Sequence, residues 1–226
     1  MNHDATGRLV LLAGGTSAAG RACARALVHA GARVVVVGSD RGRLADTAAE
    51  VPSVSTERCD LTDPDATREL ARRVHAAQGR VDGILHLVGG WRGGGGLAGQ
   101  TDDDLAFLMR SFDALRNVSR TFDDDLRASS AGRLAIVSST AVSRPLAGGA
   151  NYAAVKAASE AWTRAVAQGF AANARETGRP LAAAAVIFRV RSLADHEGEL
   201  ADAAVALWSA APSAVNDRVI DLASAG

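Results

Sequence analysis

The sequence predicts a doubly wound α/β domain, in which helices cover both faces of one parallel sheet. Short apolar runs alternate with Ala-rich amphipathic stretches along all 226 residues. The runs are continuously apolar, which is typical of parallel strands buried on both faces. A glycine-rich turn follows the first run, as in nucleotide-binding βαβ units. No repeat or linker interrupts the pattern, so we expect residues 1–226 to form a single Rossmann-type domain.

Four strands and three helices are expected in the first half of the chain. The first helix ends before Gly31, and the third begins at Pro64, after an Asp63 cap, and ends before Gly79. These are the usual positions of proline and glycine at helix ends. The expected strands are 8–13, 33–37, 54–58 and 82–88, and the expected helices are 21–30, 42–50 and 64–78.

The second half begins with a flexible segment, 89–99, that contains seven glycines. Thr101 then starts a long helix, with Asp104 placed to complete a capping box. The expected helices are 101–128, 151–177 and 197–209, and the expected strands are 133–138, 181–188 and 218–222.

Charge and hydropathy exclude several classes of protein. The 25 basic and 25 acidic side chains cancel, which argues against a nucleic-acid binder that depends on phosphate contacts. The longest apolar run, 181–188, is far too short to span a bilayer. Cys23 and Cys59 lack metal-ligand spacing and a disulfide framework, so we expect small core residues. We therefore expect a cytoplasmic protein with no nucleic-acid, membrane or metal partner.

The first loop, residues 13–20, reads Ala-Gly-Gly-Thr-Ser-Ala-Ala-Gly and lies between a strand and a helix. Backbone N–H groups and the helix dipole favour a pyrophosphate at such a place. Gly14 permits the tight turn, Gly20 permits close packing of helix against strand, and Thr16 and Ser17 offer hydroxyls. Glycine-rich turns also occur without a ligand, but the position of this one in the strand order favours nucleotide binding.

The strongest signal is a pair of residues, each of which is the only one of its type in the chain. Tyr152 is the only tyrosine in the chain and Lys156 the only lysine, against 24 arginines. Residues four apart on a helix share one face. A lysine ammonium near a phenol favours the phenolate, which suits Tyr152 to general acid–base catalysis nearer neutral pH. The alternative is an accidental pair on a solvated helix face.

These motifs, with Asp60 after the third strand and Ser139 thirteen residues before Tyr152, resemble the short-chain dehydrogenase/reductase family over essentially the whole chain. The resemblance implies that Tyr152 gives or takes the proton of the substrate oxygen. It implies that Lys156 binds the nicotinamide ribose and lowers the pKa of Tyr152, that Ser139 positions the substrate carbonyl, and that Asp60 contacts adenine. A polar residue at a strand end is the alternative for Asp60.

The end of the second strand bears on the choice of cofactor. An acid there would bind the ribose 2′-hydroxyl of NAD, but the position is Gly38. Ser39 and Arg41 are placed to bind the 2′-phosphate of NADP instead, although Asp40 opposes it. We expect NADP, with NAD or weak binding as alternatives. The expected cofactor contacts are Gly14, Thr16, Ser17, Ala19, Gly20, Ser39, Arg41, Asp60, Leu61, Val88, Gly89 and Lys156.

The chain departs from the family's pattern at four places. Ala18 replaces the second glycine of the phosphate loop, and residues 86–89 read His-Leu-Val-Gly in place of Asn-Asn-Ala-Gly. Ser111 stands where the family has the Asn of its proton relay, and 188–189 read Phe-Arg in place of Pro-Gly. We expect Ser111 to act as a catalytic residue that holds a relay water, and His86 to be a satisfied inner-strand residue.

The substrate side of the sequence is sparse. Fewer than thirty residues separate Ser192 from the last strand, which leaves little chain for a lid. Four arginines follow strand ends on the ligand side, and such a cluster suits a carboxylate or phosphate, unless they are simply solvated. They are Arg92, Arg144, Arg189 and Arg191.

We therefore expect an oxidoreductase that transfers a hydride between NADP(H) and a small-molecule carbonyl or alcohol, with an anionic group on the substrate as one alternative. A second hypothesis is a nucleotide-binding protein of the same fold without turnover, a sensor or structural subunit, because fold alone does not decide function. A third is non-redox chemistry by the same residues. The resemblance also implies a homodimer or homotetramer, formed through the long helices 101–128 and 151–177, whose Ala-rich faces permit close packing.

Overall fold

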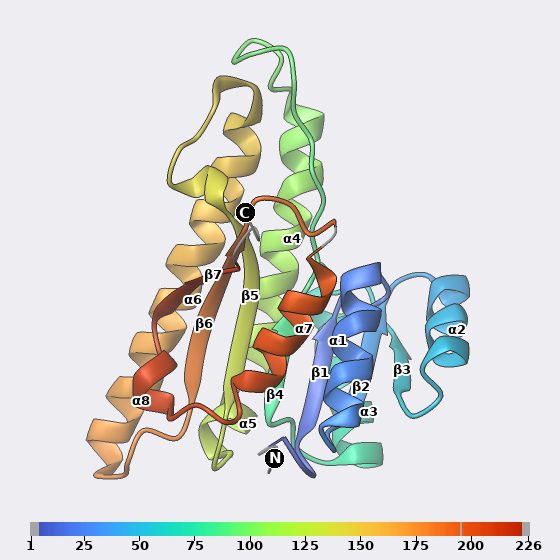
Figure 1. The fold of residues 1–226 in the computed structure, drawn as a ribbon, viewed down its shortest axis with the longest axis vertical. Coiled ribbons are helices and arrows are strands. Elements are labelled where there is room, and N and C mark those ends of the chain that lie inside the picture. The colour runs from blue at the N-terminus through green and yellow to red at the C-terminus, as the bar shows by residue number, and fades with distance from the viewer. Residues whose placement is uncertain (1–4, 195, 223–226) are drawn as a thin grey trace.

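The structure, a computed structural model, describes residues 5–194 and 196–222 and confirms the predicted fold class. Seven parallel strands form one sheet in the order β3-β2-β1-β4-β5-β6-β7 (Figure 1). The strands are β1 (Leu9–Ala13), β2 (Arg33–Gly38), β3 (Ser55–Arg58), β4 (Gly83–His86), β5 (Arg133–Ser139), β6 (Ala184–Val190) and β7 (Arg218–Asp221).

Helices connect successive strands. The α-helices are α1 (Ala18–His29), α2 (Arg41–Glu50), α3 (Pro64–Gln78), α4 (Asp102–Thr121), α5 (Asp123–Ala128), α6 (Ala150–Thr177), α7 (Glu197–Ala206) and α8 (Pro212–Val215). Two short 3-10 helices, η1 (Thr140–Val142) and η2 (Ala147–Gly149), lie between β5 and α6. The sequence predicted neither these nor α8, because elements of one turn carry too few residues to show a period.

The five inner strands of the sheet are buried on both faces, which explains their apolar runs, whereas the edge strands β3 and β7 are partly exposed. On one face, α1 and α7 pack with Leu27 and Leu200 in the core. On the other face, α3, α4 and α6 pack around Leu70 and Phe170. Figure 1 shows α1 and α7 in front of the sheet and α4 and α6 behind it.

The predicted helix 101–128 is wrong as one element, because it is two helices separated at Phe122. This residue has non-helical backbone angles (φ −107°, ψ 12°), and its side chain is fully buried. The Asp125 carboxylate in α5 accepts hydrogen bonds from the Val81 N–H (3.0 Å) and contacts His75 Nε2 (2.7 Å). Tertiary contacts therefore fix the break, and local propensity does not reveal it.

Other boundaries differ by a few residues. α1 begins at Ala18 rather than at residue 21, since Ser17 caps it. β6 runs from Ala184 to Val190 rather than over 181–188, and α7 ends at Ala206 rather than at 209. No helix within residues 5–194 and 196–222 combines the length and the hydropathy that a membrane span requires.

Candidate active site

Two cavities open at the carboxyl ends of the strands, where the winding direction reverses between β1 and β4, the usual ligand position in this architecture. The small cavity, of about 360 Å³, extends from the β1–α1 loop to the ends of β2 and β3. The large cavity, of about 1130 Å³, lies over the end of β5 and the start of α6. Leu87, Val88, Gly89 and Gly90 line both, so the cavities are two halves of one cleft.

The β1–α1 loop brings the N-terminus of α1 to the small cavity, which Gly14, Thr16 and Ser17 line. The Ser17 hydroxyl caps the helix by accepting a hydrogen bond from the Gly20 N–H at 3.1 Å. Gly14 has φ +79°, and a Cβ on Gly20 would lie 2.3 Å from the Gly15 oxygen. Both positions therefore require glycine. The loop fits a pyrophosphate, because it brings the N-terminus of α1, with the positive end of the helix dipole, to the small cavity.

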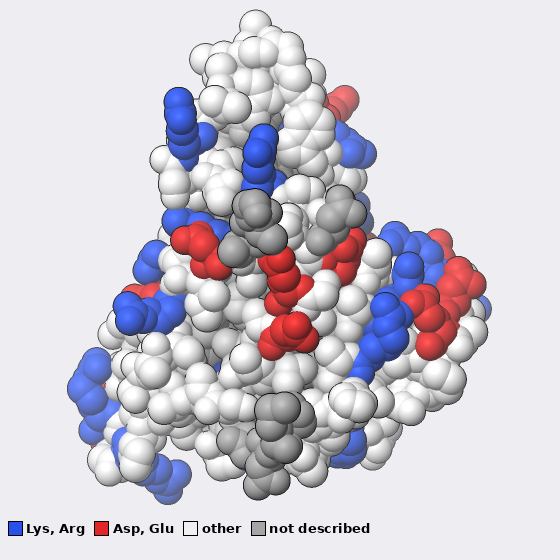
Figure 2. Space-filling model, in the orientation of Figure 1, with Lys and Arg blue, Asp and Glu red and all other residues white. Residues whose placement is uncertain are grey.

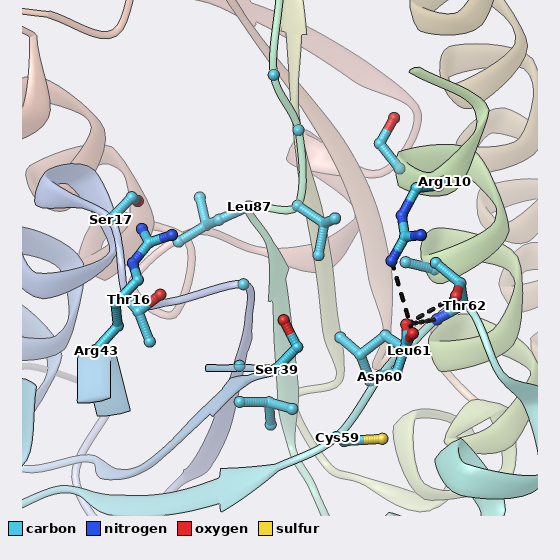
Figure 3. Close-up of a pocket in the computed structure, with 18 of the residues that line it drawn as sticks. Thr16, Ser17, Ser39, Arg43, Cys59, Asp60, Leu61, Thr62, Leu87 and Arg110 are labelled. Carbon is cyan, nitrogen blue, oxygen red and sulfur yellow. Dashed lines mark hydrogen bonds and ion pairs between the residues drawn. The ribbon is translucent and has the colours of Figure 1, made fainter. Parts of the chain in front are cut away.

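The first turn of α2, which follows β2, supplies an arginine that the sequence reasoning missed. Ser39 and Arg43 line the small cavity, and Figure 3 shows Arg43 beside Thr16. Arg41 is the exposed first residue of α2 and does not line either cavity. The two arginines lie about 200° apart around the helix. The Asp40 cap, which accepts from the Arg43 N–H at 2.8 Å, was the available signal for the true start of the helix.

Asp60 and Leu61 line the small cavity beyond β3. The Asp60 carboxylate accepts hydrogen bonds from the hydroxyl (2.7 Å) and the N–H (3.0 Å) of Thr62, and pairs with Arg110 of α4 at 3.6 Å (Figure 3). The bonds from Thr62, with a smaller effect of the Arg110 charge, hold the pKa of Asp60 below its ordinary value. Asp60 is thus a charged acceptor at neutral pH. Arg110 was not predicted, since no sequence signal relates α4 to β3.

Ser139, Tyr152 and Lys156 meet in the large cavity. Ser139 ends β5, and the other two lie one turn apart on α6. The Ser139 hydroxyl acts on the Tyr152 phenol and accepts a hydrogen bond from the Ala141 N–H at 3.2 Å. Lys156 Nζ donates to the Val137 oxygen at 2.8 Å and lies 5.8 Å from the centre of the Tyr152 ring. Gly89 lies beside this ammonium, since a Cβ there would be in ordinary contact with Nζ at 3.7 Å.

Burial sets the proton affinities of this group. It raises the pKa of Tyr152, and the Ser139 hydroxyl opposes the rise only in part. The Lys156 ammonium lies over the ring and donates to the Val137 oxygen, and its expected lowering of the Tyr152 pKa stays a prediction. Burial also lowers the pKa of Lys156 to about 8, against the opposing charge of Glu160. Tyr152 consequently holds its proton at neutral pH.

His86 lies at the end of β4, lines the large cavity and is buried. Its Nε2 hydrogen-bonds with the main-chain oxygen of Ser111 at 3.1 Å. Its Nδ1 has no hydrogen-bond partner among the described residues. His86 is an inner-strand residue, as predicted, but only one of its ring nitrogens is satisfied. Ser111 lines the small cavity. Its hydroxyl donates a hydrogen bond to the Leu108 oxygen at 2.8 Å, so the hydroxyl proton is already engaged within α4.

Two of the four predicted arginines are engaged elsewhere. Arg189 donates to the buried Glu160 carboxylate at 2.8 and 2.5 Å, so it is not free to bind a substrate anion. The Arg92 guanidinium lies 3.9 Å from the centre of the Phe107 ring. Arg144 and Arg191 are exposed on the rim of the large cavity, without a hydrogen-bond or ion-pair partner in the part of the chain that the structure describes.

Comparison with known proteins gives this arrangement a family. The family model described as short chain dehydrogenase matches residues 8–174. The chain belongs to the short-chain dehydrogenase family. A metagenomic short-chain oxidoreductase, solved in complex with NADP, has a TM-score of 0.79 at 24% identity, with 96% of this chain and 98% of that chain covered. A gluconate 5-dehydrogenase from Burkholderia cenocepacia J2315, solved with NADP and tartrate, has a TM-score of 0.80 at 21% identity, with coverages of 96% and 93%.

Sequence relatives of this short-chain dehydrogenase match only part of it. A protein of Streptomyces sp. (strain C5), provisionally named a daunorubicin C-13 ketoreductase, is 39% identical over 89 residues. The match covers 37% of this chain and 31% of that protein. The chain thus aligns with about a third of the length of that curated relative, which leaves the substrate to be argued from the site.

Most of the predicted cofactor contacts of this short-chain dehydrogenase line the cleft, and two of them support the loop from behind. Ala19 and Gly20 line neither cavity, and both are buried in the first turn of α1, where they support the loop. The other predicted contacts, apart from Arg41, line the cleft. Within the described ranges, no three His, Cys, Asp or Glu side chains form a group suited to a metal ion.

Proposed function

We propose that this protein is an NADP(H)-dependent reductase of small-molecule carbonyl compounds. The observation that carries the proposal is the meeting of Ser139, Tyr152 and Lys156 in one cavity that is continuous with a pyrophosphate-binding loop. Bound in the cleft, the nicotinamide would supply or accept the hydride. The chain's own residues would supply the proton and hold the reacting groups.

Each residue of the group has a separate task in this proposal. The Tyr152 phenol donates its proton to the substrate oxygen, and its raised pKa suits an acid in the reducing direction. The Ser139 hydroxyl, which lines the same cavity, orients the same oxygen. Lys156 holds the ribose side of the cofactor and provides positive charge beside the phenol as the proton leaves.

The preference for NADP(H) rests on the small cavity. Gly38 ends β2 where NAD-specific sites carry an acid, and Ser39 and Arg43 line the cavity beside it. Arg43 has no ion-pair partner among the described residues, so its guanidinium is available to a phosphate. That two structural neighbours were solved with NADP supports the same preference.

The substrate is expected to be bulky and apolar around its carbonyl, with an anionic group. Trp91, Leu146 and Leu193 line the large cavity, and Trp91 and Leu146 are 61% and 71% exposed. Figure 2 shows that the upper end of the molecule, where the loops 89–99 and 140–149 meet, carries few charges. Arg144 and Arg191 add the charge for an anion. The provisional ketoreductase name of the Streptomyces relative is consistent with a ketone.

The test combines binding with turnover. NADPH and NADH are titrated by cofactor fluorescence, and reduction of a panel of ketones with and without a carboxylate is followed by loss of nicotinamide absorbance. Tyr152→Phe should lower kcat about 100- to 10,000-fold and leave the Kd for NADPH within a few-fold, because only the proton donor is lost. Turnover close to wild type in Tyr152→Phe would refute the assignment. Tight NADPH binding without reduction of any carbonyl would favour the nucleotide-binding protein without turnover.

A further inference from the structure

A buried histidine in the large cavity, His86, has an unshared electron pair on one ring nitrogen, which indicates a further residue of the reaction. A main-chain oxygen only accepts hydrogen bonds, so the His86 nitrogen that faces Ser111, Nε2, carries a proton. His86 is 5% exposed, and burial, aided by the Lys156 charge, lowers its pKa to about 3. The ring is therefore neutral near pH 7, and Nδ1 carries an unshared electron pair.

This electron pair has no donor among the residues that the structure describes. A buried acceptor left without a donor destabilises the protein, which favours a donor from outside the chain. His86, Val137 and Lys156 line the same cavity. Lys156 uses one of its three N–H bonds on the Val137 oxygen, and two remain for other acceptors.

We propose that His86 is a positioning residue that holds the water of the proton supply to Lys156. The water accepts a hydrogen bond from Lys156 Nζ and donates one to His86 Nδ1, while the Nε2–H bond to Ser111 fixes the ring. The neutral imidazole anchors this water and does not itself ionise. This inference rests on the proposed function, since a proton supply is needed only if Tyr152 spends a proton in each turnover.

The proton balance of the proposal is simple. In reduction, Tyr152 gives one proton to the substrate oxygen and becomes a phenolate. The Lys156 ammonium releases one proton toward the phenolate, the held water returns one to the amine, and solvent reprotonates the water. Among the described residues, the charge of Glu160, one turn further on α6, acts on Lys156, and Glu160 is itself paired with Arg189 on β6. Lys156 is thus the group whose charge changes near neutral pH.

Two substitutions separate the two ring nitrogens. His86→Asn places an amide oxygen near the position of Nδ1 and does not reach Ser111. His86→Gln places an amide nitrogen near the position of Nε2, where it donates to the Ser111 oxygen, and leaves no acceptor near Nδ1. We expect kcat to stay within about threefold in His86→Asn and to fall about tenfold or more in His86→Gln, with KM changed less than kcat. The opposite order would show that only the bond to Ser111 matters and would overturn the proposal. Exposed His29 provides the matched control, His29→Gln.

A second readout needs neither cofactor nor substrate. Because Lys156 is the only lysine, protein labelled with ¹³C-lysine gives one side-chain NMR signal, whose titration reports the Lys156 pKa alone. Loss of the water removes an acceptor that stabilises the ammonium, so this pKa should fall by half a unit or more in His86→Gln and hold in His86→Asn. The same pKa in all variants would overturn the proposal.

The wild-type protein provides a test that survives a variant that fails to fold. Nitrogen NMR of the imidazoles should show His86 protonated at Nε2 and bare at Nδ1, and a proton on Nδ1 would overturn the proposal. If the wild-type protein reduces no carbonyl, the proposed function fails, whereas the tautomer and the Lys156 titration still report on the water at His86.

Discussion

Arg43 is the side chain on which we expect discrimination between the two dinucleotides to depend. It lines the small cavity with Ser39 beside the end of β2. A hydrogen-bonded charge pair of about 1.5–3 kcal/mol corresponds to roughly 10- to 100-fold in affinity. Arg43→Ala should therefore raise the Kd for NADPH by about that factor and leave the Kd for NADH within twofold, as measured by fluorescence titration.

Arg41 offers a matched control for this prediction, because it lies two residues away on the same helix and does not line the cavity. Arg41→Ala removes the same charge from the protein, so it should change the Kd for NADPH by no more than about twofold. Equal losses in both variants would mean that general electrostatic attraction, and not a specific contact, favours the phosphate.

The charge on Lys156 predicts the pH dependence of reduction. Burial lowers the pKa of this ammonium from 10.5 to about 8, so the residue is charged below pH 8 and becomes neutral above it. The neutral amine no longer stabilises the phenolate or supplies a proton. We expect kcat/KM for reduction, which reports the free enzyme, to fall as the pH rises through about 8. A profile that stays flat from pH 7 to 10 would contradict this role.

At the scale of elements, Arg133 connects several segments at the amino ends of the strands, which is the end of the sheet opposite the cleft. Its guanidinium is 2% exposed and donates to the main-chain oxygens of Leu207, Gly132, Ala182 and Ala210 at 2.8–3.2 Å. Arg133→Met would leave buried carbonyl groups without donors, at roughly 1–3 kcal/mol for such a loss. We expect the free energy of unfolding in urea to fall by about 3 kcal/mol, with the Kd for NADPH unchanged.

The exposed Arg68 provides the comparison, since its one ion-pair partner within the described residues is Asp65, one turn away on α3. Arg68→Met should change the free energy of unfolding by less than about 0.5 kcal/mol. An Arg133→Met protein as stable as Arg68→Met would show that the buried guanidinium contributes no net stability.

The elements also show how far the sequence carries the fold. Each strand and long helix was predicted from local signals: continuous apolar runs, the Pro64 start and the glycine stops. The break at Phe122 was not, because it depends on the contact of Asp125 with Val81 and His75, which are more than forty residues away in the chain. Local patterns therefore locate elements, and contacts between distant segments decide where they end.

At the scale of the molecule, the same division holds for the site. Tyr152 and Lys156 were predictable from a local signal, because they are the single tyrosine and the single lysine of the chain and lie one helical turn apart. The bond from His86 to the Ser111 oxygen and the ion pair of Asp60 with Arg110 join different elements, β4 or the β3 end with α4. No spacing in the sequence indicates such contacts, so these contacts between elements required the structure.

The last prediction concerns assembly through α4 and α6, which pack side by side on one face of the sheet (Figure 1). Four alanines, Ala154, Ala157, Ala161 and Ala165, are exposed at intervals of three or four residues along α6, a face on which another helix packs closely. We expect light scattering to give at least twice the 23.1 kDa chain mass. Replacing both Ala157 and Ala161 by Glu should give a monomer, because each carboxylate would be buried unpaired. The control variant Ala49→Glu, at an exposed position of α2, should not give a monomer. A monomeric wild-type protein would rule out this interface.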